Sequence, residues 1–311
     1  MMNVLIVGGA GYVGGGIVDT LSKIHDVRVY DSLIYEESYR KDVPFIYGDI
    51  RDRDLLKEHL NWADSVIWLA ALVGDGACAI NPDLTFEINS ESVRWLKDNF
   101  KGRIVFLSTC SVYGAQDTEL DETSDTNPLS EYASSKLKAE EILEGTNSII
   151  FRLGTLFGVS DKFARIRLDL VVNVLVTKAL LEGKMSVFGG EQWRPLLHVN
   201  DVASAINTTL DSDIKGIYNL HYKNYKIIDI AEEIIKKVPD SIIETTPMHF
   251  QDSRNYRVSS GKLSEVSGFK PSLDLSVGID EIYNLVSEKR IKDVNDPRYS
   301  NQSFLQQYGI T

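Results

Sequence analysis

A glycine-rich segment near the start of the chain, residues 8–14, most constrains how the chain can fold. It directly follows an apolar run over residues 4–7, and such a continuous run is typical of a strand buried on both faces. Glycines at three-residue spacing permit a sharp turn, close approach of a pyrophosphate, and tight packing of a following helix. That helix points its free amide groups at the phosphates, so the segment predicts a dinucleotide site. Its predicted contacts are Gly8, Gly11, Tyr12, Val13 and Gly14.

A second apolar run, residues 27–30, ends in Asp31 and indicates which dinucleotide binds. A carboxylate at this position can accept hydrogen bonds from both hydroxyls of the adenosine ribose, and it would repel a 2'-phosphate. A glycine triplet alone is weak evidence, because an ordinary strand-to-helix turn has the same composition. The preceding strand, the following helix and Asp31 together predict NAD, with NADP disfavoured, and Ser32 is predicted beside it.

Apolar strands alternate with amphipathic helical patterns through the first half of the chain. The expected strands cover residues 2–7, 26–31, 44–48, 63–70, 102–108 and 147–153. Such alternation specifies a parallel sheet with helices on both faces. The predicted fold class is therefore α/β, with a Rossmann-type doubly wound parallel sheet.

The second half is less regular and predicts a smaller α/β domain that covers the carboxyl ends of the strands, where ligands bind in this class. We expect an NAD-binding domain over residues 1–160, with 191–212 returning to it. Residues 161–190 and 213–311 are expected to form a substrate-binding domain. The polar tail from residue 296 is expected either to be disordered or to be anchored by its aromatic side chains.

Two further strand ends are candidates for the cofactor site. Asp49 and Ile50 follow the third strand, where they suit a helix cap and also, in this fold class, a position near the adenine. The fourth strand ends in small and apolar residues that would let a ribose and a pyrophosphate lie close. A plain packed strand end explains these residues nearly as well. They are Leu69, Ala70 and Ala71.

The predicted chemistry centres on Tyr132 and Lys136, which lie four residues apart. Residues at this spacing share one face of a helix, so the phenol and the ammonium project into the same space. A tyrosine of pKa ~10 is a poor base, and ~4 kcal/mol of differential stabilisation would bring its pKa to ~7. A nearby cation and a positive nicotinamide ring favour the phenolate, which can take a proton from a sugar hydroxyl.

Composition argues against several other classes of protein. The 33 basic and 45 acidic residues give a net charge of −12, so neither nucleic acid nor an anionic membrane is an expected partner. Cys78 and Cys110 are too few for a disulfide scaffold, and a cytoplasmic location is expected. The five histidines lack metal-ligand spacing, so no metal is expected. Neither a signal peptide nor an apolar stretch of ~18 residues is evident.

Residues 108–114, with the sequence STCSVYG, complete a set of motifs. Together with GGAGYVG, Asp31 and YASSK, in this order, they resemble the extended short-chain dehydrogenase/reductases across nearly the whole chain. More narrowly, they resemble the nucleotide-sugar epimerases and dehydratases. The resemblance implies that Thr109 hydrogen-bonds the reacting hydroxyl, that Tyr132 is the base, and that Lys136 is its partner. Ser108, Tyr132 and Lys136 are also predicted to contact the cofactor.

Further matches imply that the substrate is a nucleotide sugar. Arg194 resembles a family arginine that contacts the substrate pyrophosphate, although Pro195 stands where Asp is usual. Arg254 resembles a second phosphate-facing arginine, and Asn173 resembles an asparagine at the substrate phosphates. Guanidinium groups suit phosphate oxygens because they form two parallel hydrogen bonds. Val73 is the remaining predicted substrate contact.

One departure from the family pattern narrows the reaction. Sugar-nucleotide 4,6-dehydratases carry Asp-Glu directly after the threonine, whereas this chain has Cys110 and Ser111. Elimination of water is therefore not expected, and C4 oxidation with product release or C4 epimerisation stay open. For Arg165, Arg167 and Arg257, taken individually, a surface salt bridge is the alternative to a contact with the substrate phosphates.

Residues 72–75 and 165–173 resemble a subgroup often found in bacterial surface-polysaccharide clusters. Within it, the chain is most similar to C4 dehydrogenases that act on a GDP-manno-heptose in capsule biosynthesis. The leading hypothesis is therefore NAD-dependent oxidation at C4, with a 4-epimerase as the alternative. A non-catalytic NAD(H)-binding regulatory protein is disfavoured by the intact catalytic set. The family also implies a homodimer that pairs helices at about 83–100 and 131–145.

Overall fold

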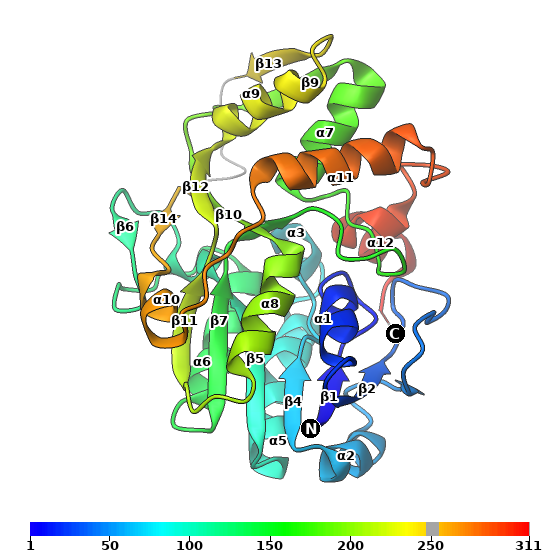
Figure 1. The fold of residues 1–311 in the computed structure, drawn as a ribbon, viewed down its shortest axis with the longest axis vertical. Helices are drawn as coiled ribbons and strands as arrows, with labels where there is room; N and C mark the ends of the chain where they lie inside the picture. Colours follow the sequence, from blue (N-terminus) through cyan, green and yellow to red (C-terminus); the bar gives the residue numbers. More distant parts are fainter. Residues whose placement is uncertain (247–254, 311) are drawn as a thin grey trace.

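The computed structural model describes residues 1–246 and 255–310, and its largest element is a seven-stranded sheet (Figure 1). Neighbouring strands run parallel, in the order β11-β7-β5-β4-β1-β2-β3. The order of the strands along the chain reverses beside β1, the point at which such sheets bind ligands. The predicted doubly wound α/β fold is confirmed. The strands are β1 (Asn3–Val7), β2 (Asp26–Asp31), β3 (Phe45–Tyr47), β4 (Ser65–Trp68), β5 (Arg103–Thr109), β7 (Ser148–Leu153) and β11 (Gly216–Leu220).

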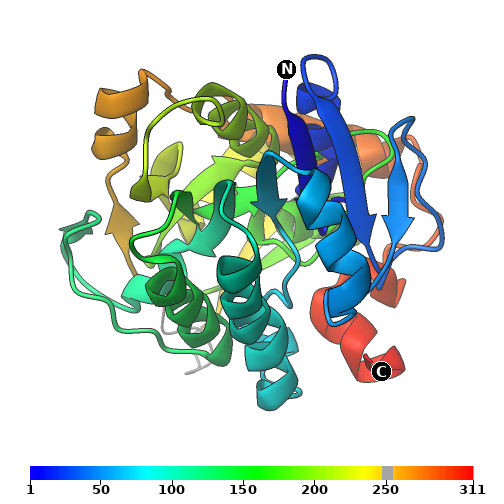
Figure 2. The ribbon, with the colours of Figure 1, turned by 90° about the horizontal axis from the view of Figure 1, so that it is seen from below.

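Helices cover both faces of this sheet (Figure 2). One face packs against α2 (Arg53–Trp62), α5 (Ser92–Asn99) and α6 (Glu131–Leu143). The other packs against α1 (Gly14–Leu21), α8 (Val199–Thr209) and α10 (Gly261–Ser267). In β1, Leu5 and Val7 face the first group, and Val4 and Ile6 face the second. Because both faces are covered, the buried part of the strand must be continuously apolar rather than alternating.

Strand β11 lies in a different part of the fold from the one predicted. We assigned all of residues 213–311 to the substrate-binding domain, but β11 pairs in parallel with β7 along five residues. Its side chains Tyr218 and Leu220 join the core formed with α1 and α8. The residues of a short apolar strand do not indicate which sheet the strand joins, so the pairing of β11 with β7 could not be predicted from the sequence pattern. The rest of the predicted division stays a prediction.

A smaller region lies above the carboxyl ends of the large sheet (Figure 1). It has a three-stranded sheet of β8 (Thr155–Phe157), β10 (Trp193–His198) and β12 (Lys223–Lys226), and a pair of β9 (Lys184–Phe188) and β13 (Ile242–Thr246). A further pair joins β6 (Glu119–Leu120) to β14 (Arg257–Val258). A separate apolar core packs together α7 (Val171–Glu182), α9 (Ile227–Lys237) and α11 (Leu275–Ser287). This region therefore has its own hydrophobic support.

The C-terminal tail is ordered and returns to the first part of the chain. It forms a short turn of helix, η3 (Pro297–Tyr299), followed by α12 (Asn301–Tyr308). Phe304 packs edge-on against Tyr35 with ring centroids 4.9 Å apart. Of the two predicted alternatives for the tail, the anchored one is therefore observed, and it uses one of the expected aromatic residues.

The expected helix over residues 83–100 is divided into three parts. It begins as α4 (Pro82–Phe86), widens into a π-helical turn η1 (Glu87–Glu91), and continues as α5. Such turns often occur where a helix supports a functional site.

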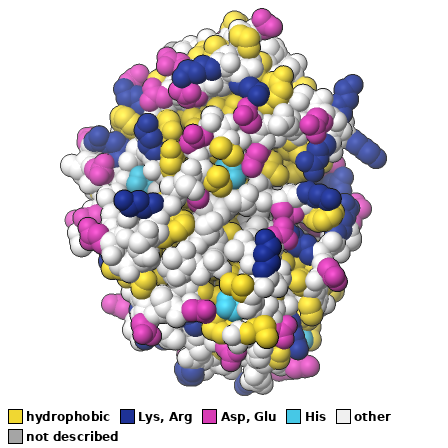
Figure 3. Space-filling model, viewed as in Figure 1, with side chains coloured by type: hydrophobic (Ala, Val, Ile, Leu, Met, Phe, Trp, Pro, Cys, Tyr) yellow, Lys and Arg dark blue, Asp and Glu magenta, His cyan; other side chains and the backbone are white. Residues whose placement is uncertain are grey.

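Lys and Arg side chains are interspersed with Asp and Glu across the face shown in Figure 3. Among the helices of the described residues, none is long and apolar enough to cross a membrane.

Candidate active site

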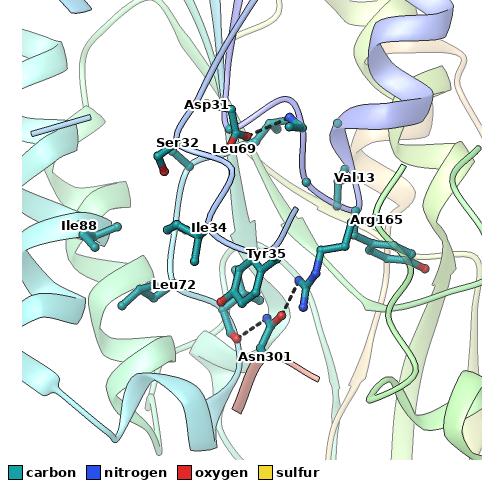
Figure 4. Close-up of a pocket in the computed structure, with 18 of the residues that line it drawn as sticks. Val13, Asp31, Ser32, Ile34, Tyr35, Leu69, Leu72, Ile88, Arg165 and Asn301 are labelled. Atoms are coloured by element: carbon teal, nitrogen blue, oxygen red, sulfur yellow. Dashed lines mark hydrogen bonds between the residues drawn. The ribbon is translucent and has the colours of Figure 1, made fainter. Parts of the chain in front are cut away.

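A pocket lies at the carboxyl ends of β1, β2, β4 and β5 (Figure 4). Every residue predicted for the cofactor site lines it, as does Val73 from the predicted substrate contacts. The carboxyl ends of parallel strands meet at one edge of the sheet, which explains why segments far apart in the chain converge here. The lining residues that were predicted are Gly8, Gly11, Tyr12, Val13, Gly14, Asp31, Ser32, Asp49, Ile50, Leu69, Ala70, Ala71, Val73, Ser108, Tyr132 and Lys136.

The glycine-rich loop passes so close to other backbone that side chains would not fit. Gly8 has a φ of +84°, and a Cβ there would collide with the backbone of Ala70. A Cβ at Gly14 would collide with the backbone of Gly9. Only glycine therefore allows the loop to pack this closely against neighbouring backbone at these two positions.

Asp31 holds the glycine-rich loop against the end of β2. Its Oδ2 accepts a hydrogen bond from the amide of Ala10 (2.9 Å), and its Oδ1 accepts one from the amide of Leu33 (2.7 Å). Burial raises the pKa of Asp31, while these backbone bonds oppose the rise. Each carboxylate oxygen has a second lone pair, so both can still accept a hydrogen bond from a ribose hydroxyl.

The loop after β4 is held in place by Asn89, a residue that the sequence analysis missed. Its Oδ1 accepts the amide of Leu72 (2.8 Å), and its Nδ2 donates to the carbonyl of Leu72 (2.9 Å) and to Ser135 (3.0 Å). Asn89 lies in the π-helical turn η1 and is almost fully buried. It therefore links the pocket wall to α6, which carries Tyr132. In the sequence, the only signal for the role of Asn89 was its polar side chain within an otherwise amphipathic helical pattern.

Asp49 lines the pocket, but Arg51 already engages its carboxylate. Arg51 Nε lies 3.0 Å from Asp49 Oδ1, and Arg51 Nη2 lies 2.8 Å from Oδ2. The bonds to Arg51 hold the pKa of Asp49 below its ordinary value. Asp49 thus lies beside the pocket, but the cap of α2 is Asp52, whose Oδ1 accepts a hydrogen bond from the amide of Leu55 (3.2 Å).

Tyr132 and Lys136 lie on the first part of α6 and face the pocket from the end of β5. Burial raises the pKa of Tyr132, and a hydrogen bond with the Thr109 side chain is among the smaller influences that lower it. Burial lowers the pKa of Lys136 to about 8, and its Nζ lies 4.4 Å above the ring of Phe106. Among the protein's own groups, burial outweighs the nearby positive charge, whereas the expected phenolate depends also on the positive nicotinamide ring.

Ser108 connects the pocket to a buried ion pair that sequence reasoning also missed. The Ser108 hydroxyl donates to Glu140, which lies one helical turn after Lys136. Arg152 Nη2 lies 2.6 Å from Glu140 Oε2, and both side chains are at most 5% exposed. The Glu140 carboxylate therefore lies directly behind the catalytic end of the pocket.

The structure places only some of the predicted substrate contacts in the lining of the pocket. Of the described residues, the pocket lining includes neither Thr109, Asn173 nor Arg194. Asn173 Oδ1 accepts the amide of Gly158 (3.0 Å), and its Nδ2 donates to the carbonyl of Arg167 (2.7 Å). A phosphate contact would therefore require Asn173 to exchange bonds with the chain's own backbone. Arg194 is buried in β10 and donates to the carbonyl of Trp193, and Arg254 lies outside the described residues.

Arg165 and Arg167, for which surface salt bridges were an alternative, both line the pocket. Arg165 stacks on Tyr35, 3.7 Å from the ring centroid, and its Nη1 donates to Asn301 Oδ1 (2.6 Å; Figure 4). Asn301 in turn donates to the carbonyl of Val73 (2.7 Å). The C-terminal tail thus forms one wall of the pocket. No periodicity links residues so far apart in the chain, so the sequence carried no signal for this wall.

The residues present fit a dinucleotide. The glycine cradle leaves space against the backbone, and Asp31 offers acceptors for the ribose. Tyr35 also lines the pocket, and its buried hydroxyl has no hydrogen-bond partner among the described residues. Within the described residues, no group of three or more His, Cys, Asp or Glu side chains could hold a metal ion.

Fold and site together fit a dinucleotide-dependent enzyme. The model of the NAD dependent epimerase/dehydratase family matches residues 4–220, and the chain therefore belongs to that family. This confirms the predicted class, an NAD-dependent enzyme related to nucleotide-sugar epimerases and dehydratases.

Individual relatives carry out different reactions. A protein provisionally named UDP-glucose 4-epimerase from Methanocaldococcus jannaschii is 29% identical over 301 residues, covering 90% of this chain and 97% of its own. A UDP-N-acetyl-alpha-D-glucosaminuronate decarboxylase from Bacillus cytotoxicus is 26% identical, covering 89% and 95%. The fold also matches the Thermus thermophilus UDP-glucose 4-epimerase solved with NAD, with a TM-score of 0.78 and 24% identity, covering 90% and 99%. Family membership thus leaves the reaction at the sugar open.

Proposed function

We propose that this protein oxidises C4 of a nucleotide-activated sugar, with Tyr132 as the base and NAD as the hydride acceptor. The observation that carries this proposal is the convergence of two sets of residues in one pocket. Tyr132, Lys136 and Ser108 line the pocket whose opposite part contains Asp31 and the glycine-rich loop. A pocket that joins a proton-transfer group to a dinucleotide cradle suits an oxidoreductase better than a binding module.

The residues that would hold NAD are those of the cradle. Asp31 would accept the adenosine-ribose hydroxyls, and the backbone of the glycine-rich loop would face the pyrophosphate. Lys136 would hold the nicotinamide ribose. When bound, NAD supplies acceptance of the hydride from the substrate carbon and a positive charge on its ring.

The chain's own residues handle the proton. Tyr132 in its phenolate form takes the proton of the C4 hydroxyl. The C4–H bond breaks, its hydrogen leaves as hydride, and C4 becomes a ketone. Because burial raises the pKa of Tyr132, the phenolate needs positive charge nearby. Lys136, with a pKa of about 8, is mostly protonated at neutral pH, and the charge of Arg167 is the largest influence that lowers the pKa of Tyr132. Thr109 would orient the substrate hydroxyl from the side of β5.

The residues after Thr109 argue against water elimination. The Cys110 thiol donates to the carbonyl of Arg152 and is fully buried, and burial raises its pKa. The Ser111 hydroxyl lies 3.3 Å from the Tyr256 hydroxyl. Neither side chain can act as a carboxylic acid, and both face inward. A 4-keto sugar formed here would either take hydride back or leave.

C4 epimerisation is the second candidate, and the relatives named 4-epimerases favour it. A GDP-manno-heptose is the first substrate to test for the dehydrogenase, on the strength of the subgroup resemblance alone. We further propose that the smaller region binds the sugar nucleotide. We also propose that α5 and α6, which pack side by side, form a homodimer contact.

The deciding experiment is incubation of the full chain and NAD with a panel of nucleotide sugars that includes a GDP-manno-heptose. Product mass and NADH absorbance are followed, and the Tyr132→Phe variant serves as the control. A product two hydrogens lighter, with NADH formed, supports the dehydrogenase. Unchanged mass with inverted C4 supports the epimerase. Loss of water would contradict both and show that Cys110 and Ser111 do not prevent elimination.

A further inference from the structure

Arg167 is held rigidly at the wall of the pocket. It lies in the connection between β8 and α7 and lines the pocket although its side chain is only 11% exposed. Its Nε lies 2.9 Å from Asp169 Oδ1 and its Nη2 lies 3.1 Å from Asp169 Oδ2. Asn173 holds its carbonyl through a 2.7 Å hydrogen bond. A long side chain fixed in this way has lost most of its rotamer freedom before any ligand arrives.

Arg167 differs from the other basic residues of the pocket in the N–H groups that remain free to donate hydrogen bonds. Among the described lining residues, the basic ones are Lys136, Arg165 and Arg167. Lys136 sits over Phe106 at the catalytic end, and Arg165 donates to the carbonyl of Arg298 and to Asn301. In Arg167, Asp169 takes bonds from Nε and Nη2, and Nη1 makes no hydrogen bond to a described residue. Three of the five N–H groups of the guanidinium, two on Nη1 and one on Nη2, therefore remain for a ligand.

The glycine-rich loop needs such a partner. Residues 8–14 contain no basic side chain, so this loop can offer a phosphate only backbone amides. Burial raises the pKa of Tyr12, within that loop, and of Tyr132, at the catalytic end. In both cases the charge of Arg167 is the largest influence that opposes the rise. Its charge thus acts on the space between the loop and the catalytic end.

The local charge balance also favours an anion. Arg165 and Arg167 share one buried carboxylate, Asp169, because the hydrogen bonds of Arg165 go to neutral acceptors. Half-buried Glu36 is a smaller influence on Arg165. Burial lowers the pKa of Arg165 to about 10, and the repulsive charge of Arg167 adds to this effect.

We propose that Arg167 binds the diphosphate group of a ligand in this pocket, where the glycine-rich loop offers only backbone amides. The proposal rests on the proposed function only in its choice of ligands. A diphosphate is present both in NAD and in a nucleotide sugar, and a guanidinium group suits its oxygens. Asp169 positions the fork, and the remaining N–H groups make the contact.

The test measures binding, not turnover, on the full chain freed of bound nucleotide. Dissociation constants for NAD, ADP, adenosine and UDP-glucose are measured by calorimetry for the wild type and for R167M, R167K and D169N. D169N is the matched control, since it removes the ion pair but keeps the guanidinium. Thermal unfolding of each variant shows whether it folds, and R167K covers the case in which R167M does not.

We expect R167M to weaken binding of a diphosphate ligand by about 10- to 100-fold, as loss of a charge-assisted hydrogen bond predicts. Adenosine affinity should stay within about twofold, R167K should be intermediate, and D169N should lose about threefold at most. Loss confined to NAD and ADP assigns Arg167 to the dinucleotide. Loss confined to UDP-glucose assigns it to the substrate.

Three results would overturn the proposal. They are unchanged affinity for every diphosphate in R167M, an equal loss for adenosine, and a D169N variant that reproduces the whole loss. A wild-type protein that binds UDP-glucose but not NAD would refute the proposed function. The Arg167 proposal would still be tested in that case by the affinity of the variants for UDP-glucose. Failure of the wild type to bind either ligand would refute both.

Discussion

Replacing Glu140 by Gln would break a buried ion pair directly behind the catalytic end of the pocket. Arg152 Nε lies 3.1 Å from both carboxylate oxygens of Glu140, and Nη2 lies 2.6 Å from one of them. The two side chains are 2% and 5% exposed, so solvent screens the pair little. The change leaves the Arg152 charge buried without a counter-charge, which costs about 3–5 kcal/mol. Because Gln keeps the volume and one acceptor, we expect about 3 kcal/mol.

The assay is equilibrium unfolding in urea for E140Q, R152M and the double variant. Each single variant strands one buried charge, whereas the double variant removes both. The double variant should therefore lose much less free energy of unfolding than the sum of the two single variants. Single losses below about 1 kcal/mol, or additivity within about 0.5 kcal/mol, would refute the argument from burial.

The same variant has a second readout at Lys136. Burial lowers the pKa of Lys136 to about 8, and the charge of Glu140 is one of the influences that oppose this. Removing that charge lowers the pKa further, so Lys136 loses its proton at a lower pH. If turnover requires the ammonium, the alkaline limb of the pH–rate profile moves to lower pH in E140Q. A limb that stays in place or moves upward contradicts a role for Glu140 in supporting Lys136.

Three other variants test separate parts of the site. D31A should reduce the preference for NAD over NADP by at least ~10-fold in binding, because it removes two acceptors and a repulsive charge; equal wild-type affinity for both would contradict the assignment. Y132F should lower turnover by about 10²- to 10⁴-fold while NAD affinity stays within about twofold, and comparable activity would place the base elsewhere. N301A removes the bonds to Arg165 and Val73, so nucleotide release in stopped-flow measurements should speed up. An unchanged release rate would count against the C-terminal tail as a functional wall.

Local patterns in the sequence determined much of the fold and one half of the site. The continuous apolar run of β1 predicted a strand covered on both faces, and both faces are covered. The glycine spacing predicted a loop pressed against other backbone, and added Cβ atoms at Gly8 and Gly14 would collide with it. The four-residue spacing placed Tyr132 and Lys136 on one helical face beside the same pocket. Each of these properties follows from steric or periodic rules that act within about twenty residues.

The tertiary structure alone decided which distant segments complete the pocket. Arg165 meets Asn301 across 136 residues, and Asn301 meets Val73 across 228. Asn89 and Glu140 act through side-chain bonds to loops and strands that no periodicity connects to them. Burial also raises the pKa of Tyr132, and the size of this effect depends on everything packed around the phenol. Long-range contacts and local dielectric arise only when the elements pack together, so a linear pattern could predict the glycine-rich loop but not the wall that the C-terminal tail forms.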